Sequence, residues 1–459
     1  MFQRPAELNM VKTESKRVLP KGCFEDMIIK KEKQKGRPVM KKITFAVMGM
    51  GNRGTAYAAK ALKYPDEMEI TAMADTRRVR LDAANKYLNL PQDRLFDSAE
   101  ALLEQPKLAD IMVVATQDAQ HRAHALKAME LGYDLLLEKP ISNKLADCVE
   151  LVKAAEKMDR KVFICHVLRY TVFYQQIKRL IDEGVVGKVM SIEAMEQVGV
   201  HHYCHSYVRG NWHKEADSSP MILAKCSHDM DILPWLVGKK CLKVSSFGAL
   251  THFKAENCPE GATERCADCA LDCPFHANRY YKSRLPGWPC NILHPEPTEE
   301  NITEILKTSN YGRCVYKMDN DVVDHQTVNM LLEDDITVSF QMTGFTNRQT
   351  RTIRVMGTEG EIWGDFHDKE LYFRRYCRDA EKVDLEALCD DFTGHGGGDA
   401  RIVYDVIRYM RGDDFDTSSM TTIDRSAQSH FVAFAAEKSR IFGGQVIEMD
   451  AFRKDLGIE

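Results

Sequence analysis

Residues 43–54 read ITFAVMGMGNRG and decide the fold. The first six form a short apolar run of the kind that is buried on both faces in a parallel sheet. Three closely spaced glycines follow at once and open a segment with helical periodicity that runs to about Lys63. A second strand is predicted over 69–74 and ends at Asp75. Strand, glycine turn, helix and strand in this order are typical of a dinucleotide-binding unit.

The chemistry of dinucleotide binding accounts for these residue types. Gly49, Gly51 and Gly54 permit a tight turn, close approach of the backbone to a pyrophosphate, and close packing of helix on strand. The helix start adds unpaired N–H groups for the phosphates. Asp75 can accept hydrogen bonds from the adenosine ribose, which favours NAD. Arg77 and Arg78 follow closely and could hold a 2′-phosphate instead, so NADP stays open.

The next segments continue the alternation of strands and helices. Strands are predicted over 111–115, 135–137 and 162–164, with helices over 77–89, 121–131 and 144–157. This spacing indicates an α/β Rossmann domain with a doubly wound parallel sheet. We assign it to residues 42–166.

The pattern changes after residue 166. Strands predicted over 189–198, 243–250, 337–342 and 352–356 have no helix between each pair. We therefore expect an α+β domain over 167–459 with a large, mostly antiparallel open sheet, closed by a helix over 426–441. Within it, residues 255–320 hold many Cys and Pro with little periodicity and are interpreted as an insertion. Residues 1–41 form a charged N-terminal extension.

Composition excludes several functional classes. The chain has 459 residues, 63 Lys and Arg against 68 Asp and Glu, and a net charge of −5, which argues against a nucleic-acid binder. No apolar run approaches the roughly 20 residues that span a membrane. Fourteen cysteines are too sparse for a secreted disulfide scaffold, and the first 42 residues show no apolar signal region. We expect a cytoplasmic enzyme with reduced thiols.

Glu138-Lys139-Pro140 follows the fourth predicted strand. The carboxyl ends of the strands in an open α/β sheet border the crevice that binds ligand. A lysine at this edge can polarise a hydroxyl or carbonyl oxygen, and burial would lower its pKa enough for acid–base work. A lysine that merely extends from a strand end to solvent is the alternative.

These motifs resemble the glucose–fructose oxidoreductase/inositol dehydrogenase (Gfo/Idh/MocA) family over about residues 42–442. The resemblance rests on the glycine turn, Asp75, Ala115-Thr116 with His121, Glu138-Lys139-Pro140, and the change to an antiparallel second domain. It implies NAD(P) in the first domain, a sugar, cyclitol or related polyol at the open sheet of the second, and a homodimer or tetramer. The cofactor-binding residues expected are Gly49, Gly51, Asn52, Arg53, Gly54, Asp75, Thr116, His121, Glu138 and Lys139.

The resemblance also assigns the catalytic residues. Lys139 matches the signature lysine of the family, and His228 matches a histidine expected to act as general base. In the family an Asp precedes this histidine by four residues, but here that position is Ala224. Lys225, Asp229 or Asp231 could replace the missing carboxylate in its role, and we place Lys225 with Lys139 and His228 among the catalytic candidates.

Other polar segments suggest substrate contacts. Residues 165–170 end in an Arg-Tyr pair, and residues 201–213 carry aromatic and polar side chains suited to sugars. Residues 319–325 and the glycine-rich 394–399 are further pocket candidates, the second resembling a segment of relatives that act on glycosides. The substrate-binding residues expected are Arg169, Tyr170, Tyr207, Arg209, Trp212, Asp231, His325 and His395.

Four cysteines lie close together in the insertion: Cys258, Cys266, Cys269 and Cys273. Four thiolates at such spacings can enclose one ion tetrahedrally, so we expect a structural zinc. An iron–sulfur cluster, free thiols or a redox disulfide are the alternatives, and Cys290 or Cys314 could replace one of the four.

Together these features predict an NAD-dependent oxidoreductase that transfers hydride between a ring hydroxyl of a sugar, glycoside or cyclitol and nicotinamide. A redox glycosidase is one alternative: oxidation, elimination, water addition and re-reduction would leave no net redox change. A non-catalytic NAD-binding sensor is another, kept open by Ala224. No nucleic-acid or membrane partner is expected.

Overall fold

The computed structural model describes residues 41–457. The predicted N-terminal extension lies outside the described residues, apart from Lys41. Within the described range, no helix is long and apolar enough to cross a membrane.

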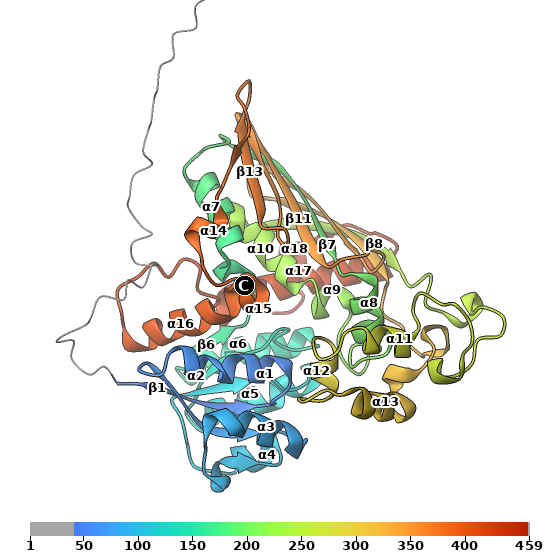
Figure 1. The fold of residues 1–459 in the computed structure, drawn as a ribbon. Helices are drawn as coiled ribbons and strands as arrows, with labels where there is room; N and C mark the ends of the chain where they lie inside the picture. The colour runs from blue at the N-terminus through green and yellow to red at the C-terminus, as the bar shows by residue number, and fades with distance from the viewer. Residues whose placement is uncertain (1–40, 458–459) are drawn as a thin grey trace, which may run out of the picture. The chain divides into compact units, whose positions relative to one another are not determined.

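The first sheet has six parallel strands in the order β3-β2-β1-β4-β5-β6. Its central strands are buried on both faces, because helices cover both sides (Figure 1). This confirms the predicted Rossmann sheet. The strands are β1 (Ile43–Met48), β2 (Met68–Ala74), β3 (Leu95–Phe96), β4 (Ile111–Val114), β5 (Asp134–Leu137) and β6 (Val162–Ile164).

The helices between these strands follow the predicted positions to within a few residues, except α4 (Ala99–Leu103), which was not predicted. The helix after the glycine turn is broken at Ala59 into two pieces. The helices are α1 (Asn52–Ala58), α2 (Lys60–Lys63), α3 (Arg78–Leu88), α4 (Ala99–Leu103), α5 (His121–Glu130) and α6 (Leu145–Lys157).

The second sheet has nine strands in the order β14-β13-β12-β11-β7-β10-β9-β8-β15. All neighbours are antiparallel except β7 and β10, which confirms the predicted mostly antiparallel sheet. The strands are β7 (Val189–Gln197), β8 (Cys241–Ala249), β9 (His325–Leu332), β10 (Thr337–Thr343), β11 (Thr350–Gly357), β12 (Gly360–Asp365), β13 (Glu370–Arg375), β14 (Glu381–Lys382) and β15 (Ile447–Glu448).

Helices cover one face of this sheet and leave the other open. Residues of β10 alternate between exposed and buried, as expected for a sheet with one solvated face. The longest helix, α17, packs against β8, α10 and α6 (Figure 1). The helices are α7 (Val172–Asp182), α8 (Val200–Tyr203), α9 (Met221–Ala224), α10 (Ser227–Val237), α14 (Leu385–Leu388), α15 (Thr393–Gly396), α16 (Gly398–Arg411), α17 (Ile423–Ile441) and α18 (Met449–Lys454).

The insertion over residues 255–320 is more regular than its sequence suggests. It contains the helices α11 (Ala277–Lys282), α12 (Cys290–Leu293) and α13 (Glu299–Thr308) around a small apolar core of its own. Thr298 and Asn301 form a reciprocal cap at the start of α13. The prediction of an aperiodic insertion missed this signal.

Helix α16 returns from the second half of the chain to the first sheet. Its residues Ile402, Val403 and Val406 belong to the same buried apolar cluster as Phe45 of β1. The domain boundaries 42–166 and 167–459 stay predictions, but the packing of α16 ties the two halves together. This contact brings the loop before α16 to the glycine turn.

Candidate active site

The glycine turn after β1 leaves room for a ligand at one position only. Gly49 has a φ of +88°, and a Cβ there would lie 2.4 Å from the Ala115 carbonyl oxygen. A Cβ on Gly54 would lie 1.9 Å from the Gly49 carbonyl oxygen. A Cβ on Gly51 would approach only Arg80, at 3.7 Å. Gly49 and Gly54 are therefore needed because any side chain there would clash with the backbone. The open space next to Gly51 fits the close approach of a pyrophosphate.

Asp75 lies at the end of β2, buried and facing this turn. Its carboxylate accepts hydrogen bonds from the backbone N–H of Met50 at 2.7 Å and of Arg77 at 2.8 Å. Arg80 Nη1 lies 3.4 Å from it. Arg77 donates to the Leu293 carbonyl oxygen of the insertion, and Arg78 pairs with Asp82. Arg77 and Arg78, which could have held the 2′-phosphate of NADP, thus already have protein partners.

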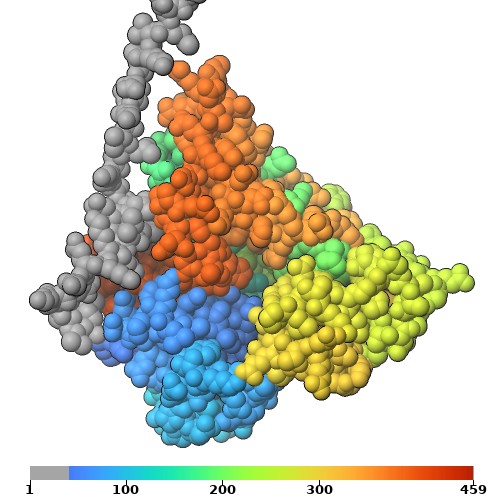
Figure 2. Space-filling view, in the orientation of Figure 1, coloured from blue at the N-terminus to red at the C-terminus, as the bar shows by residue number. Residues whose placement is uncertain are grey.

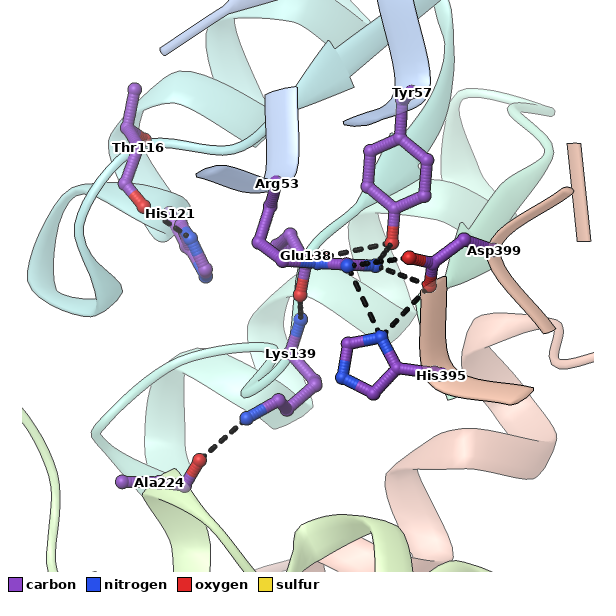
Figure 3. A network of polar contacts seen from close by, with 9 residues as sticks. All are labelled: Arg53, Tyr57, Thr116, His121, Glu138, Lys139, Ala224, His395 and Asp399. Carbon is purple, nitrogen blue, oxygen red and sulfur yellow. Dashed lines mark hydrogen bonds and ion pairs between the residues drawn. The ribbon is translucent and has the colours of Figure 1, made fainter. Parts of the chain in front are cut away.

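Arg53, in the first turn of α1, joins three segments that are distant in the sequence (Figure 3). Its Nε donates to Glu138 at 2.7 Å, and two of its nitrogens donate to the two carboxylate oxygens of Asp399 at 2.8 Å each. The Tyr57 hydroxyl also donates to Glu138 at 2.7 Å. Burial alone would raise the pKa of Glu138, but the charges of Arg53 and Lys139 outweigh it and lower that pKa.

Thr116 and His121 support the loop that carries Lys139. The two ring nitrogens of His121 lie 2.7 Å from the Pro140 carbonyl oxygen and 3.1 Å from the Thr116 carbonyl oxygen. The Thr116 hydroxyl bonds to His124 at 2.9 Å. Since both nitrogens of His121 are engaged by backbone, this residue positions the Glu138-Lys139-Pro140 loop.

Lys139 points from the end of β5 toward the helices of the second domain. Its Nζ donates to the Ala224 carbonyl oxygen at 2.5 Å, so the position that departs from the family motif still contacts the lysine through its backbone (Figure 3). Burial lowers the pKa of Lys139, and the neighbouring Glu138 opposes this only in part. A lysine of this kind can hold or release a proton nearer neutral pH than a solvated one.

His228, in the first turn of α10, is buried beside Lys139. Its Nδ1 has no hydrogen-bond partner among residues 41–457. Burial, and then the positive charge of Lys139, lowers the pKa of His228 well below its usual range. The imidazole is therefore neutral and able to accept a proton.

Lys225 also lies near the catalytic candidates, but its charge is paired with a carboxylate. Its Nζ is 3.4 Å from Glu196, which also pairs with Arg351 at 2.6 Å. Arg351 in turn binds Asp229 through two hydrogen bonds of 2.8 and 3.1 Å. Lys225 and Asp229, two of the predicted replacements for the missing carboxylate, thus belong to one buried charge cluster.

His395 supplies the histidine–carboxylate pair that the Ala224 position lacks. Its Nδ1 lies 3.0 Å from Asp399 and 3.2 Å from Arg53, and its ring centroid is 6.1 Å from that of His228. In Figure 3 its second ring nitrogen points away from Asp399, toward the side of Lys139. The residue has a φ of +48° between glycines. Strained backbone of this kind is concentrated at functional sites.

A cavity of about 540 Å³ opens from His395 across the end of the second sheet. The ends of β7 and β11, the residues before α8, and the insertion form its walls. His201 and His202 of the predicted sugar-binding segment line it, as do Tyr280 and Trp288 of the insertion, which the sequence did not single out.

Most of the other predicted substrate residues have protein partners elsewhere. Arg169 binds Asp231 through hydrogen bonds of 2.7 and 2.6 Å, a buried pair that lowers the pKa of Asp231 against the effect of its burial. The Tyr170 hydroxyl bonds to Thr421 in the core at 3.0 Å. His325 bonds to Asp324 at the start of β9. None of these four predicted residues lines the cavity.

The remaining predicted contacts, Tyr207, Arg209 and Trp212, also turn away from the cavity. Tyr207 is buried in a π-helical turn over 204–208. Arg209 donates to the Arg313 and Phe275 carbonyl oxygens and holds the insertion. Trp212 donates to Asp118 at 3.2 Å, which links the second domain to the first.

The structure does not support the predicted zinc site. Across residues 41–457, no three Cys, His, Asp or Glu side chains come together in a way that could hold a metal ion. Cys266 contacts the Arg209 guanidinium at 3.7 Å and the Arg313 carbonyl oxygen at 3.8 Å, so a cation already neighbours this sulfur. Burial raises the pKa of Cys273, which favours the neutral thiol. The cysteines of the described range are free.

Comparisons with known proteins bear on these features. The model described as "Oxidoreductase family, NAD-binding Rossmann fold" matches residues 43–166. The model of the GFO/IDH/MocA C-terminal domain matches residues 174–284. The chain belongs to the GFO/IDH/MocA family. The resemblance noted in the sequence is thereby confirmed, and the family supports NAD as the cofactor and oxidoreduction as the activity.

Individual GFO/IDH/MocA relatives are distant. YteT of Bacillus subtilis (strain 168), named as an oxidoreductase, is 23% identical over 386 residues, or 80% of this chain and 88% of that protein. The 2,7-anhydro-N-acetylneuraminate hydratase of Escherichia coli (strain K12) is 27% identical over 220 residues. That match covers 46% of this chain and 54% of the hydratase, so the chain spans about half the length of this relative.

A solved structure shares the fold of this GFO/IDH/MocA protein. An inositol dehydrogenase homologue from Azotobacter vinelandii, crystallised with NADH and myo-inositol, superposes with a TM-score of 0.63. It is 15% identical, and the match covers 89% of this chain and 98% of that one.

Proposed function

We propose that this protein oxidises a ring hydroxyl of a sugar, glycoside or cyclitol, with NAD as hydride acceptor. The observation that carries the proposal is the pair formed by Lys139 and His228, next to His395, which lines a cavity of sugar size. A neutral, buried histidine beside a buried lysine has the charge states that alcohol oxidation needs.

Each residue has a defined part in this reaction. The glycine turn and Asp75 would hold the cofactor, which supplies the hydride acceptor when bound. His228 accepts the hydroxyl proton as the C–H bond breaks. Lys139, fixed by the Ala224 carbonyl oxygen, stabilises the oxygen as it becomes a carbonyl. Arg53 holds Glu138 and the loop of Lys139 in place. Lys225 belongs to the charge cluster of Glu196 and Arg351 and is held in place by it.

His395 favours a second candidate, the redox-neutral glycosidase or lyase reaction. A ketone formed at one ring carbon acidifies the neighbouring C–H, whose proton must go to a second base before the leaving group departs. His395, paired with Asp399 and adjacent to His228, is placed for this proton. Water addition and return of the hydride would then complete the cycle with no net redox change.

A screen of sugars, cyclitols and aryl glycosides with NAD tests both candidates. NADH absorbance and aglycone release are followed in parallel. Stoichiometric NADH supports the dehydrogenase, and aglycone release with catalytic NAD supports the redox-neutral reaction. Both activities should be lost in Lys139→Ala. No turnover of any polyol by a protein that still binds NAD would contradict the proposal and favour the sensor.

Three further expectations remain predictions. They are the homo-oligomer, formed in the family through the open sheet, the cytoplasmic location, and the assignment of individual cofactor contacts to Asn52 and the residues around it.

A further inference from the structure

We infer that the substrate carries an anionic group, a carboxylate or a phosphate, which Arg284 of the insertion binds at the outer end of the cavity. This inference rests on the proposed function and specifies its substrate class. It assigns a binding role to the insertion, which contains no metal site among the described residues.

Among residues 41–457, the wall of the cavity contains no acidic residue. None of the sixteen side chains and backbone positions that line it belongs to Asp or Glu, although Asp and Glu outnumber Lys and Arg in the whole chain. Three arginines and four histidines line it instead. An acidic protein that keeps one cavity free of carboxylates favours an anion there over a neutral ligand.

Two of the three arginines are already paired. Arg348 binds Asp365 at 2.7 Å and Asp368 at 2.6 Å. Arg351 binds Asp229 and Glu196, as described above. The charges of these guanidinium groups are balanced by carboxylates that do not line the cavity. They shape the cavity and leave little charge for a ligand.

Arg284 differs from both. Across residues 41–457, no hydrogen bond or ion pair engages its guanidinium group, which lies 5.6 Å from the centre of the Tyr280 ring. The planar fork of an arginine matches a carboxylate or phosphate through two parallel hydrogen bonds. An unpaired arginine on the wall of a cavity is thus available to an anionic ligand.

Aromatic side chains of the insertion accompany this arginine. Tyr280 stacks on His201 with ring centroids 4.4 Å apart, and Trp288 meets His202 edge-on at 4.9 Å. Trp288 is 38% exposed although it lines the cavity. An accessible indole face suits the C–H face of a sugar ring. The insertion thus offers a ring platform and a charge side by side.

The cavity extends from Arg284 to His395, which neighbours the catalytic His228. His202 lines the cavity, and burial, followed by the positive charge of Lys225, lowers its pKa. His395 lines the same cavity near His228. A sugar bound in the cavity with its reacting hydroxyl toward His395 and His228 would therefore direct a substituent on another ring atom toward Arg284.

The insertion is fixed in place by both halves of the chain. Arg77 of the first domain donates to the Leu293 carbonyl oxygen at 2.8 Å, and Lys86 pairs with Glu296. Arg209 holds its other side. Figure 2 shows the yellow surface of the insertion against the blue surface of the first domain. Arg284 is therefore presented from a supported element, which favours specific recognition.

Matched pairs of small ligands test the inference by direct binding. Methyl β-D-glucoside is compared with methyl β-D-glucuronide, methyl β-D-galactoside with methyl β-D-galacturonide, and glucose with glucose 6-phosphate. Binding to the full chain with NADH is measured by calorimetry. In at least one pair the anionic member should bind about 10-fold more tightly. The uronides and the phosphate distinguish the two sources of charge.

Arg284→Ala should reduce that ratio to within about twofold, because it removes a charge-assisted hydrogen bond. Arg378→Ala, at an exposed arginine in the turn after β13, is the matched control and should keep the ratio. Equal binding within every pair, binding of no ligand, or an unchanged ratio in Arg284→Ala would overturn the inference. Turnover with equal affinities for the anionic and neutral ligands would support the proposed function and overturn the anion site. Selective binding of the anionic ligand without turnover would support the anion site and refute the proposed function.

Discussion

The inner and outer ends of the active-site region differ in whether their arginines are paired with carboxylates. At the inner end, Arg53 is bound to Glu138 and Asp399 and joins the glycine turn, the lysine loop and α16. At the outer end, Arg284 has no acidic partner among the described residues, and the cavity wall carries no carboxylate. Paired, buried charges fix elements in place, whereas an unpaired charge is free for a ligand. The inner end thus positions catalytic groups, and the outer end recognises substrate.

The largest effect is expected at Lys139, whose role at the inner end is chemical. Lys139→Met keeps most of the side-chain volume but removes the charge that stabilises the developing carbonyl, so kcat should fall about 10³-fold. Steady-state kinetics on a substrate from the screen measure this, with NADH binding followed by fluorescence. The exposed Lys144→Met is the control. A kcat within threefold of wild type would contradict the assigned role.

Removal of Arg53 tests whether the inner end is structural. Arg53→Met leaves Glu138 and Asp399 buried without their cation, which should cost about 3–5 kcal/mol in the free energy of unfolding. Arg122→Met breaks an exposed pair with Glu150 and should leave the free energy of unfolding almost unchanged. Urea unfolding followed by circular dichroism compares the two. Equal losses of unfolding free energy in the two variants would contradict the claim that Arg53 has a structural role that an exposed arginine lacks.

His395 separates the two candidate reactions. If the reaction is redox-neutral, His395→Gln should slow aglycone release about 10²-fold while hydride transfer in a single turnover stays within about threefold. Stopped-flow absorbance at the NADH band and aglycone release report the two steps. A fall in both steps by the same factor would mean that His395 only supports the fold of the site.

The pH dependence tests the neutral state of His228. Burial and Lys139 lower its pKa, so the deprotonated base persists below the usual histidine range near pH 6.5. The acid limb of kcat/KM should therefore lie below that value, and the lowered pKa of Lys139 should bring the alkaline limb below about 10.5. A profile of kcat/KM against pH measures both limbs. An acid limb above pH 6.5 would contradict the neutral histidine.

The smallest effect is expected for cofactor choice. Asp75→Ser removes the carboxylate that faces the adenosine ribose in the assigned site, so the preference for NAD over NADP should fall about 10-fold. The ratio of kcat/KM values for the two cofactors measures it. An unchanged ratio would mean that Arg80 of α3 or residues of the glycine turn select the cofactor instead.

The elements formed by contiguous residues could be predicted from the sequence, and those formed by distant ones could not. The strands over 43–48 and 111–114 and the glycine turn follow from local patterns. Strand β3 has only two residues and gives no pattern to detect. Arg53 and Asp399 are 346 positions apart, and no local sequence pattern indicates that they pair.

The same limit applies to the cavity wall and the cysteines. Arg284 and Trp288 reach the cavity only because the insertion folds back against α8, which depends on its own small core. The spacing of Cys258, Cys266, Cys269 and Cys273 suggested zinc, but spacing does not determine where the sulfur atoms point. Arg209 and Cys266, which contact each other, are 57 positions apart, so the spacing of the cysteines gives no sign of this neighbour.

One measurement tests the central claim, that Lys139 and His228 carry out an oxidation beside the cavity. A sugar found to bind is mixed with NAD and wild-type protein or His228→Asn under single-turnover conditions, and absorbance at the NADH band is recorded. We expect NADH to form in the wild type, persisting or decaying, and to form about 10²-fold more slowly in the variant. No absorbance change in the wild type, or equal rates in both proteins, would contradict the claim.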